Sequence, residues 1–228
     1  MNWFQIAQSK VETFFDIEQR IPEAEGQQRC IAAVDAFHHL FTILAAELHI
    51  REEWPDAHCH IVPFSTGIIE HSPKIGVDFT LGISLFGWFI EAPIASPHQI
   101  RQMRDDYWQH IARLSTLGRA ELHDFGRPCG WSSSPDVRKL TQHKCSLVYS
   151  IARDFTLLAS TPEGCSSLGC IHITLPLESD EPTVRAFFKQ ALESLYRSNH
   201  MLYRAEYLDR RRLMKKFKAQ ATHELNEG

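Results

Sequence analysis

The sequence lacks the short motifs that mark the common catalytic and cofactor-binding sites. It contains no Gly-x-Ser-x-Gly elbow, no Gly-x-x-x-x-Gly-Lys-Ser/Thr phosphate loop and no dinucleotide-binding glycine fingerprint. The adjacent acids Asp105 and Asp106 fall within a helical pattern, where charged residues usually form a solvated face. These absences favour a protein that is not an enzyme, and they leave any cofactor unknown.

Signals for export and for membrane insertion are also missing. The first residues carry no basic region followed by an apolar run, so we expect no signal peptide. The apolar stretch from Phe79 to Ile90 is too short to span a bilayer, which takes about 20 residues. The six cysteines have no spacing typical of a disulfide framework. We therefore expect a cytoplasmic protein with reduced thiols and no transmembrane segment.

What the chain does contain is enough apolar material for a packed core. Of its 228 residues, 43% are hydrophobic and 11% are aromatic, which excludes global disorder. The formal net charge of -4 argues against bulk affinity for nucleic acid, although a local basic patch can still form.

Helical patterns occupy both ends and the middle of the chain. Apolar residues repeat at three and four positions, as one face of a helix requires. Ser96 and Asp180 (or Ser179) precede a proline at or near the first turn of a helix and are suitable caps. The expected helices cover residues 2–20, 27–50, 97–118, 135–152 and 182–205, with the last continuing towards the end of the chain.

Strand patterns lie between these helices. Ile75, Val77, Phe79 and Leu81 alternate, which places them on one face of a strand. The other expected strands cover residues 58–64, 83–90, 155–160 and 168–177, the last two forming a hairpin. The order of elements predicts an α+β fold with a central antiparallel β-sheet flanked by helices and with long N- and C-terminal helices.

Two segments carry a resemblance to a known family. Residues 37–50 running into 58–64 look like the first helix and strand of a GAF domain, a sensor fold related to PAS, and residues 155–175 look like its final hairpin. The resemblance covers residues 27–205 and implies a small-molecule sensor whose terminal helix dimerises. A Ser/Cys-rich turn replaces the charged loop of the family's hairpin, so the type of ligand does not transfer.

The patterns divide the chain into three parts. Residues 1–26 are an N-terminal helix, residues 27–181 an α+β GAF-like core, and residues 182–228 a long C-terminal helix continuous with the core. Phe188, Leu195 and Leu202 follow a heptad-like spacing and are the expected dimer interface. The end of this helix carries a basic patch formed by Arg210, Arg211, Arg212, Lys215 and Lys216.

Candidate ligand-binding residues come from the apolar strands and from an irregular loop over residues 121–134. Apolar pockets with a few polar groups are typical of ligand sites, and loops often carry the polar groups. The candidates are Phe79, Trp88, His123, Asp124, Arg127 and Trp131.

A metal site has one weak candidate. His58 and His60 alternate on an expected strand and therefore point to one face, where two imidazoles can bind Zn²⁺. No further ligand follows at a characteristic spacing, so ordinary sheet histidines remain the simpler interpretation.

These observations lead to one main hypothesis and two alternatives. The main one is a regulatory or sensor protein without enzymatic activity that binds a small molecule or a protein partner and signals as a homodimer through its terminal helix. The first alternative is a protein-binding adaptor, inhibitor or immunity-type module. The second is a regulator that associates with nucleic acid through its basic C-terminal helix. For that helix end itself, a membrane-surface helix and a merely solvated helix end are further interpretations.

Overall fold

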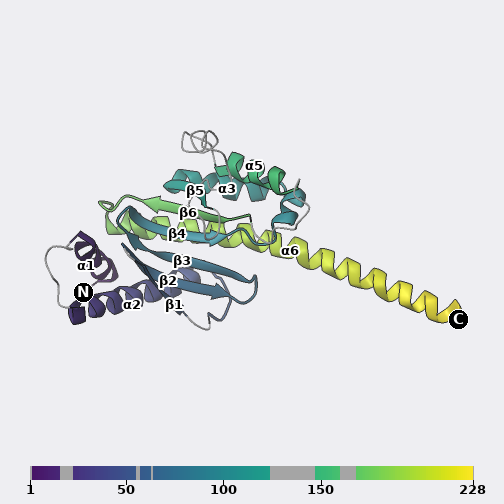
Figure 1. The fold of residues 1–228 in the computed structure, drawn as a ribbon, viewed down its shortest axis with the longest axis horizontal. Coiled ribbons are helices and arrows are strands. Elements are labelled where there is room, and N and C mark those ends of the chain that lie inside the picture. Colours follow the sequence, from purple (N-terminus) through teal and green to yellow (C-terminus); the bar gives the residue numbers. More distant parts are fainter. Residues whose placement is uncertain are drawn as a thin grey trace.

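The structure, a computed structural model, describes residues 2–15, 23–54, 57–62, 64–123, 147–159 and 168–227. It has an α+β fold with one six-stranded antiparallel sheet in the order β1-β2-β3-β4-β6-β5 (Figure 1). The fold class predicted from the sequence is therefore confirmed. The strands are β1 (Ala57–Val62), β2 (Ser65–Ser72), β3 (Val77–Ser84), β4 (Gly87–Pro93), β5 (Arg119–His123) and β6 (Cys170–Leu175).

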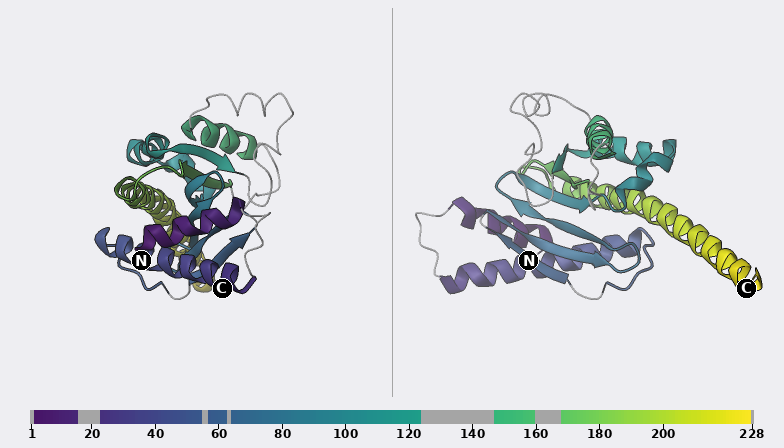
Figure 2. Two further views of the ribbon diagram at one scale, coloured as in Figure 1. Left: turned by 90° about the vertical axis from the view of Figure 1, so that its left-hand side faces the viewer. Right: turned by 45° about the vertical axis from the view of Figure 1, so that its right-hand side comes forward.

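Helices flank this sheet and extend beyond it. They are α1 (Trp3–Phe15), α2 (Glu23–Glu47), the 3-10 helix η1 (Pro97–Gln102), α3 (Asp105–Leu117), α5 (Leu147–Ala159) and α6 (Glu181–Glu227). Figure 2 shows α1 and α2 close together and α3 and α5 grouped at the other side of the molecule. Helix α6 runs along the sheet and then projects away from it (Figure 1).

The core forms on one face of the sheet. Val77, Phe79, Leu81 and Ile83 alternate along β3 and are almost fully buried, as their spacing predicts. Trp88 on β4 lies at the centre of an aromatic cluster to which α1, α2 and α6 each contribute. Its ring contacts Phe4 (stacked, 5.0 Å between centroids), Trp3 (6.1 Å), Phe37 (6.4 Å) and Phe188 (6.4 Å).

Helix α2 is long and apolar enough, by length and composition, to cross a membrane. In this fold Phe37, Phe41 and Leu44 are nearly inaccessible to solvent within the core. These three residues thus have the surroundings of a core helix, whereas Ile31, nearer the start of α2, is 60% exposed. The helix begins at Glu23 and includes Gly26, so it starts earlier than the sequence pattern indicated.

The strand predicted at residues 155–160 is wrong. Residues 147–159 form helix α5, with Leu147 and Ile151 buried one turn apart, and residue 160 lies outside the described residues. A short apolar run such as Phe155 to Ala159 fits a strand or a helix equally well until its neighbours are known. Strand β6 instead pairs with β4 and β5, so the expected hairpin, on which part of the GAF resemblance depends, does not form.

Two further boundaries differ from the sequence prediction. The single helix expected from Pro97 to Gly118 is divided into η1 and α3, and Ser96 adopts a left-handed conformation (φ 48°) without capping η1 through its side chain. The strand expected over residues 83–90 is also divided, because β3 and β4 meet in a tight turn. Phe86 lies in this turn and is 85% exposed, although its spacing suggested an apolar cluster.

Helix α6 begins as its sequence predicts. The Asp180 carboxylate accepts a hydrogen bond from the backbone N–H of Thr183 at 3.0 Å, and Pro182 occupies the first turn, where its missing N–H costs nothing. This hydrogen bond, with one from the Thr183 side chain, lowers the pKa of Asp180. The helix start is therefore fixed locally, before any tertiary contact.

Candidate functional site

A cleft follows the side of α6 where this helix leaves the domain. Its main hollow has a volume of about 540 Å³ and is lined by α6, by the segment after α2 and by the turn between β2 and β3. A second hollow of about 410 Å³ continues along α6 towards Arg210 and shares Lys74 with the first. Hollows of this size match small-molecule sites, which measure about 300–1,000 Å³.

The wall after α2 is shaped by the way this helix ends. His49 adopts a left-handed conformation (φ 54°), its N–H bonds to the Ala46 carbonyl at 3.0 Å, and the Ile50 N–H bonds to the Ala45 carbonyl at 3.0 Å. This is the Schellman arrangement, which usually places glycine at the left-handed position. The reversal of the chain brings Arg51 to the rim of the cleft.

The opposite wall is a turn that is tied to α6 through one carboxylate. Ser72 donates a hydrogen bond to Glu52 at 2.5 Å, and the hydroxyl of Tyr196 on α6 donates to the same Glu52 side chain. Gly76, at φ 65°, closes the turn, with its N–H bonded to the Ser72 carbonyl at 2.8 Å. Glu52 therefore links three chain segments and holds Lys74 beside α6.

The cleft has an excess of positive charge that the protein does not neutralise. Four cations and two carboxylates, Asp106 and Glu193, line it, and Glu193 is already engaged by Arg197 at 2.8 Å and by Arg113 at 3.8 Å. Within the described residues, Arg51, Lys74 and Arg204 make no ion pair. Exposed cations are common, but three that surround one hollow create a local field attractive to anions.

A row of aromatic rings lies along the same side of α6. Tyr196, His200, Tyr203 and Tyr207 follow one another at helical spacing, with ring centroids 6.1, 6.3 and 6.4 Å apart. Burial, and then the nearby charges of Lys74 and Arg204, hold the pKa of His200 below its ordinary value, against the opposing effect of Glu52. The cleft thus combines aromatic surface, three cations that form no ion pair with described residues, and the imidazole of His200, whose lowered pKa makes protonation less favourable than in a free histidine.

Phe79 and Trp88, two of the sequence-predicted ligand residues, do not line this cleft. Phe79 and Trp88 are fully buried in the core. The ring of Phe79 contacts the ring of Tyr196, which lines the cleft, at a centroid distance of 6.2 Å. His123 is the last residue of β5. The remaining candidates, Asp124, Arg127 and Trp131, lie outside the described residues.

The sequence-predicted metal pair lies on the face of the sheet that points away from Phe79 and Leu81. His58 and His60 both belong to that face of β1, as expected, and burial lowers the pKa of His60. Its ring contacts Phe89 at 5.8 Å, and Phe89 stacks on His172 at 5.5 Å. Among the described residues no group of three His, Cys, Asp or Glu side chains could hold a metal ion.

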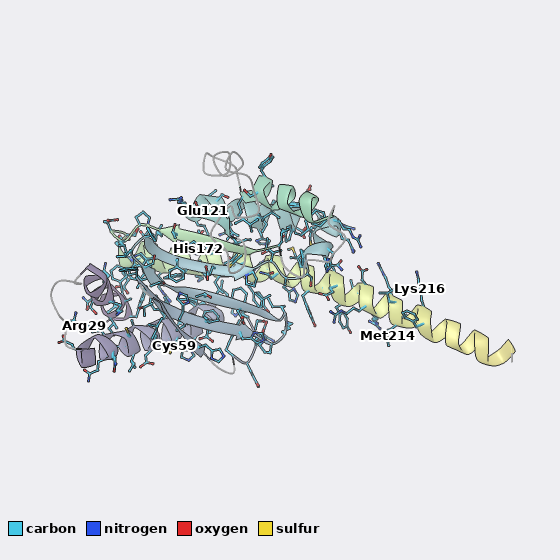
Figure 3. All side chains as sticks on the ribbon, viewed as in Figure 1. Arg29, Cys59, Glu121, His172, Met214 and Lys216 are labelled. Carbon is cyan, nitrogen blue, oxygen red and sulfur yellow. The ribbon has the colours of Figure 1, made fainter. Side chains whose placement is uncertain are left out.

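A further hollow of about 660 Å³ lies beside His172, near the start of β5. Three of its four ionisable lining groups, Arg119, Glu121 and His172, pair within the protein, and the fourth is the carboxylate Glu178. Arg119 contacts Glu121 at 2.7 Å, and His172 bonds to Glu91 at 2.8 Å. Figure 3 shows Glu121 and His172 on the neighbouring strands β5 and β6. We therefore place the candidate site in the α6 cleft and not here.

The predicted dimer interface has a different role in this fold. Phe188, Leu195 and Leu202 are at most 1% exposed, because their side of α6 packs into the chain's own core. Their assignment to a dimer interface is therefore corrected. The basic patch at Arg210–Arg212, Lys215 and Lys216 lies on the exposed part of α6, as predicted.

Sequence reasoning missed the cleft because its cations come from distant segments. Arg51, Lys74 and Arg204 are far apart in the chain and belong to no motif. The spacing Tyr196-x3-His200-x2-Tyr203-x3-Tyr207 is the one signal that could have identified this side of α6 as more than a solvated face.

No family model matches the chain, and neither a curated protein nor a solved structure matches it.

Proposed function

We propose that this protein is a regulatory domain without enzymatic activity that binds a small anionic molecule in the α6 cleft. The observation that carries the proposal is the convergence of Arg51, Lys74 and Arg204 on one hollow, each without an ion-pair partner in the described residues. The aromatic row supplies apolar contact area for the rest of such a molecule. A phosphate- or carboxylate-bearing compound with an apolar or aromatic portion fits this combination.

Helix α6 is the element that transmits occupancy. It contributes Tyr196, Arg197, His200 and Arg204 to the cleft and then continues beyond the domain. A ligand bridging α6 to Arg51 and Lys74 favours arrangements in which these segments lie close together. It shifts the population of helix arrangements only if it binds one arrangement more tightly than the others. Dimerisation through Phe188, Leu195 and Leu202 is not part of this proposal, because these residues are buried.

Calorimetric titration with inorganic pyrophosphate tests the site directly. We expect saturable binding by the wild type and at least a ~10-fold loss of affinity in each of Lys74→Gln and Arg204→Gln, since each removes a cation from the hollow. Arg185→Gln is the matched control, because it removes one cation from the same helix outside the cleft.

Two results would contradict the proposal: no binding by the wild type, or an equal loss in the control. Native mass spectrometry of gently purified protein then shows whether an anionic compound and a second copy accompany the chain. Hydrogen exchange along α6, with and without pyrophosphate, tests transmission, and we expect added protection around residues 193–204.

A further inference from the structure

The last part of α6 leaves the domain and keeps no described contact with it. The final links are the hydrogen bond from Ser96 to Glu206 and that from Gln102 to Asp209 at 2.8 Å. All side chains from Arg210 to Phe217 are exposed. We call residues 210–217 the tail segment, and Figure 1 shows it within the projecting end of α6.

The tail segment has two chemically different sides. Successive residues of an α-helix turn by about 100°, so Leu213, Met214 and Phe217 share an arc about 100° wide. They are 54%, 58% and 64% exposed. Figure 3 labels Met214 and Lys216, which lie about 160° apart around the helix.

The opposite side of the tail segment is basic. Arg211, Arg212, Lys215 and Lys216 centre about 180° away from the apolar arc. Arg212 makes a loose pair with Asp209 at 3.6 Å, and the other three make no ion pair with any described residue. Arg210 is the one cation within the apolar arc, and it pairs with Glu206 one turn earlier.

An exposed helix with such faces is stable only when something covers its apolar side. A second copy of the same helix is a poor cover, because packing through the two apolar arcs would place Arg210 of each copy in the contact. Each copy also carries five cations against two carboxylates over residues 206–217, so two copies repel each other. Nucleic acid would neutralise the cations but leave Leu213, Met214 and Phe217 in water. An anionic lipid surface satisfies both sides, since headgroups attract the basic side and the acyl boundary accepts the apolar one.

We propose that the tail segment of α6 docks this protein on anionic membrane surfaces. The helix lies in the plane of the interface, with Leu213, Met214 and Phe217 inserted below the headgroups. The basic side holds it through Arg211, Lys215 and Lys216. This inference does not depend on a ligand in the α6 cleft, so either proposal can fail without the other.

Vesicle co-sedimentation of the full chain tests the docking. We expect binding to phosphatidylcholine vesicles that contain phosphatidylserine, little binding to phosphatidylcholine alone, and weakening as salt rises. Two triple variants separate the contributions. One is Leu213→Ser with Met214→Ser and Phe217→Ser, and the other is Arg211→Gln with Lys215→Gln and Lys216→Gln. Each is expected to bind at least ~10-fold more weakly, since one variant removes the side chains that insert below the headgroups and the other removes the attraction to anionic headgroups.

Both variants are expected to fold, because the altered side chains contact no other described part of the chain. Thermal unfolding checks this. The matched controls are Phe86→Ser, which removes a residue that is 85% exposed on the β3–β4 turn, and Arg185→Gln on the packed part of α6. Both controls are expected to bind vesicles like the wild type.

Four outcomes would overturn the inference. The first is no binding to either kind of vesicle, and the second is equal binding to both kinds. The third is a dimer in sedimentation equilibrium that dissociates in the Leu213→Ser, Met214→Ser, Phe217→Ser variant while vesicle binding stays unchanged. A second copy of the chain would then cover the apolar side. Duplex DNA that binds the tail more tightly than anionic vesicles do would also replace the lipid surface as the partner.

Discussion

Both ends of helix α6 carry apolar residues at helical spacing, but the surroundings of these residues differ. Leu195 and Leu202, in its first half, are buried among the helices and strands of the domain, whereas Leu213 and Phe217, in its second half, are more than half exposed. Apolar residues at helical spacing thus form core at one end and free surface at the other. The difference teaches that spacing identifies a side of a helix, and only the surrounding chain decides whether that side is already occupied.

The cleft lies between these two ends and shares features of both. Asn199, 2% exposed, accepts a hydrogen bond from the Ala95 N–H at 2.9 Å and donates to the Leu195 carbonyl at 3.1 Å, so α6 is still firmly packed there. On the adjacent side, Arg204 is exposed and unpaired among the described residues. We call the anchor point at Asn199 the junction. Predictions that compare the packed half, the junction, the cleft and the tail can separate these roles.

The largest effect is expected in the packed half. Leu195→Ala should lower the free energy of unfolding by about 2–5 kcal/mol, because it leaves a cavity in the core. Leu213→Ala, the matched change in the tail, should alter it by no more than about 0.5 kcal/mol. Urea unfolding followed by circular dichroism measures both. Similar losses for the two variants would mean that the tail is packed in solution and would remove the contrast between the halves.

The junction is expected to give an intermediate effect. Asn199→Ala should cost about 1–3 kcal/mol, since it leaves the partly buried Ala95 N–H without its acceptor. The same unfolding experiment measures the loss. Asn199→Asp is the control, because it keeps the acceptor for the Ala95 N–H and loses only the donor. An unchanged unfolding free energy in Asn199→Ala would show that α6 is not anchored at this point.

The cleft should respond to pH through His200. Its pKa lies below the ordinary value in the free protein, so an anion that stabilises the imidazolium must bind together with a proton. Affinity for sulfate, which keeps its charge over this range, should therefore rise about threefold or more as pH falls below about 6.5, the ordinary value for histidine. Calorimetry across the pH range measures this rise.

His200→Gln supplies the control for this pH dependence, and it should flatten the profile. Without an anion the sign is opposite, because the unfolded chain takes up the proton more readily and stability falls as pH falls below about 6.5. A wild-type affinity that does not change with pH, or a rise that persists in the variant, would show that His200 does not face the bound anion.

The smallest effect on stability is expected from removing the tail. A chain ending at Arg210 should keep its unfolding free energy within about 0.5 kcal/mol and keep its affinity for pyrophosphate, since the removed residues line neither hollow of the cleft. The same chain should lose its binding to anionic vesicles. A large loss of stability would instead mean that α6 beyond Arg210 supports the domain.

Much of the local structure could be predicted from the sequence, and the reasons are physical. The alternation of Val77, Phe79 and Leu81 predicted a strand that buries these residues on one face, and Asp180 before Pro182 has the chemistry of a helix cap. The run from Phe155 to Ala159 failed because it is short, apolar and without a decisive period. Ser96 failed because its hydroxyl bonds to Glu206, a distant residue that local rules do not include.

The candidate site itself was beyond the reach of local pattern. Phe79 and Trp88 have the composition of pocket residues, but in the fold they meet other aromatic side chains and leave no space. The residues that do surround a hollow come from the end of α2, the β2–β3 turn and α6. Their charges have no significance until the chain brings them together.

The sequence by itself determined the α+β class, the buried face of β3, the start of α6 and the basic end of that helix. Each depends on residues within a few positions of one another, where backbone geometry sets the outcome. Only the tertiary structure decided that the Leu195 side of α6 packs on its own sheet and that Arg51, Lys74 and Arg204 face one cleft. These outcomes depend on contacts between segments far apart in the chain, which local periodicity does not encode.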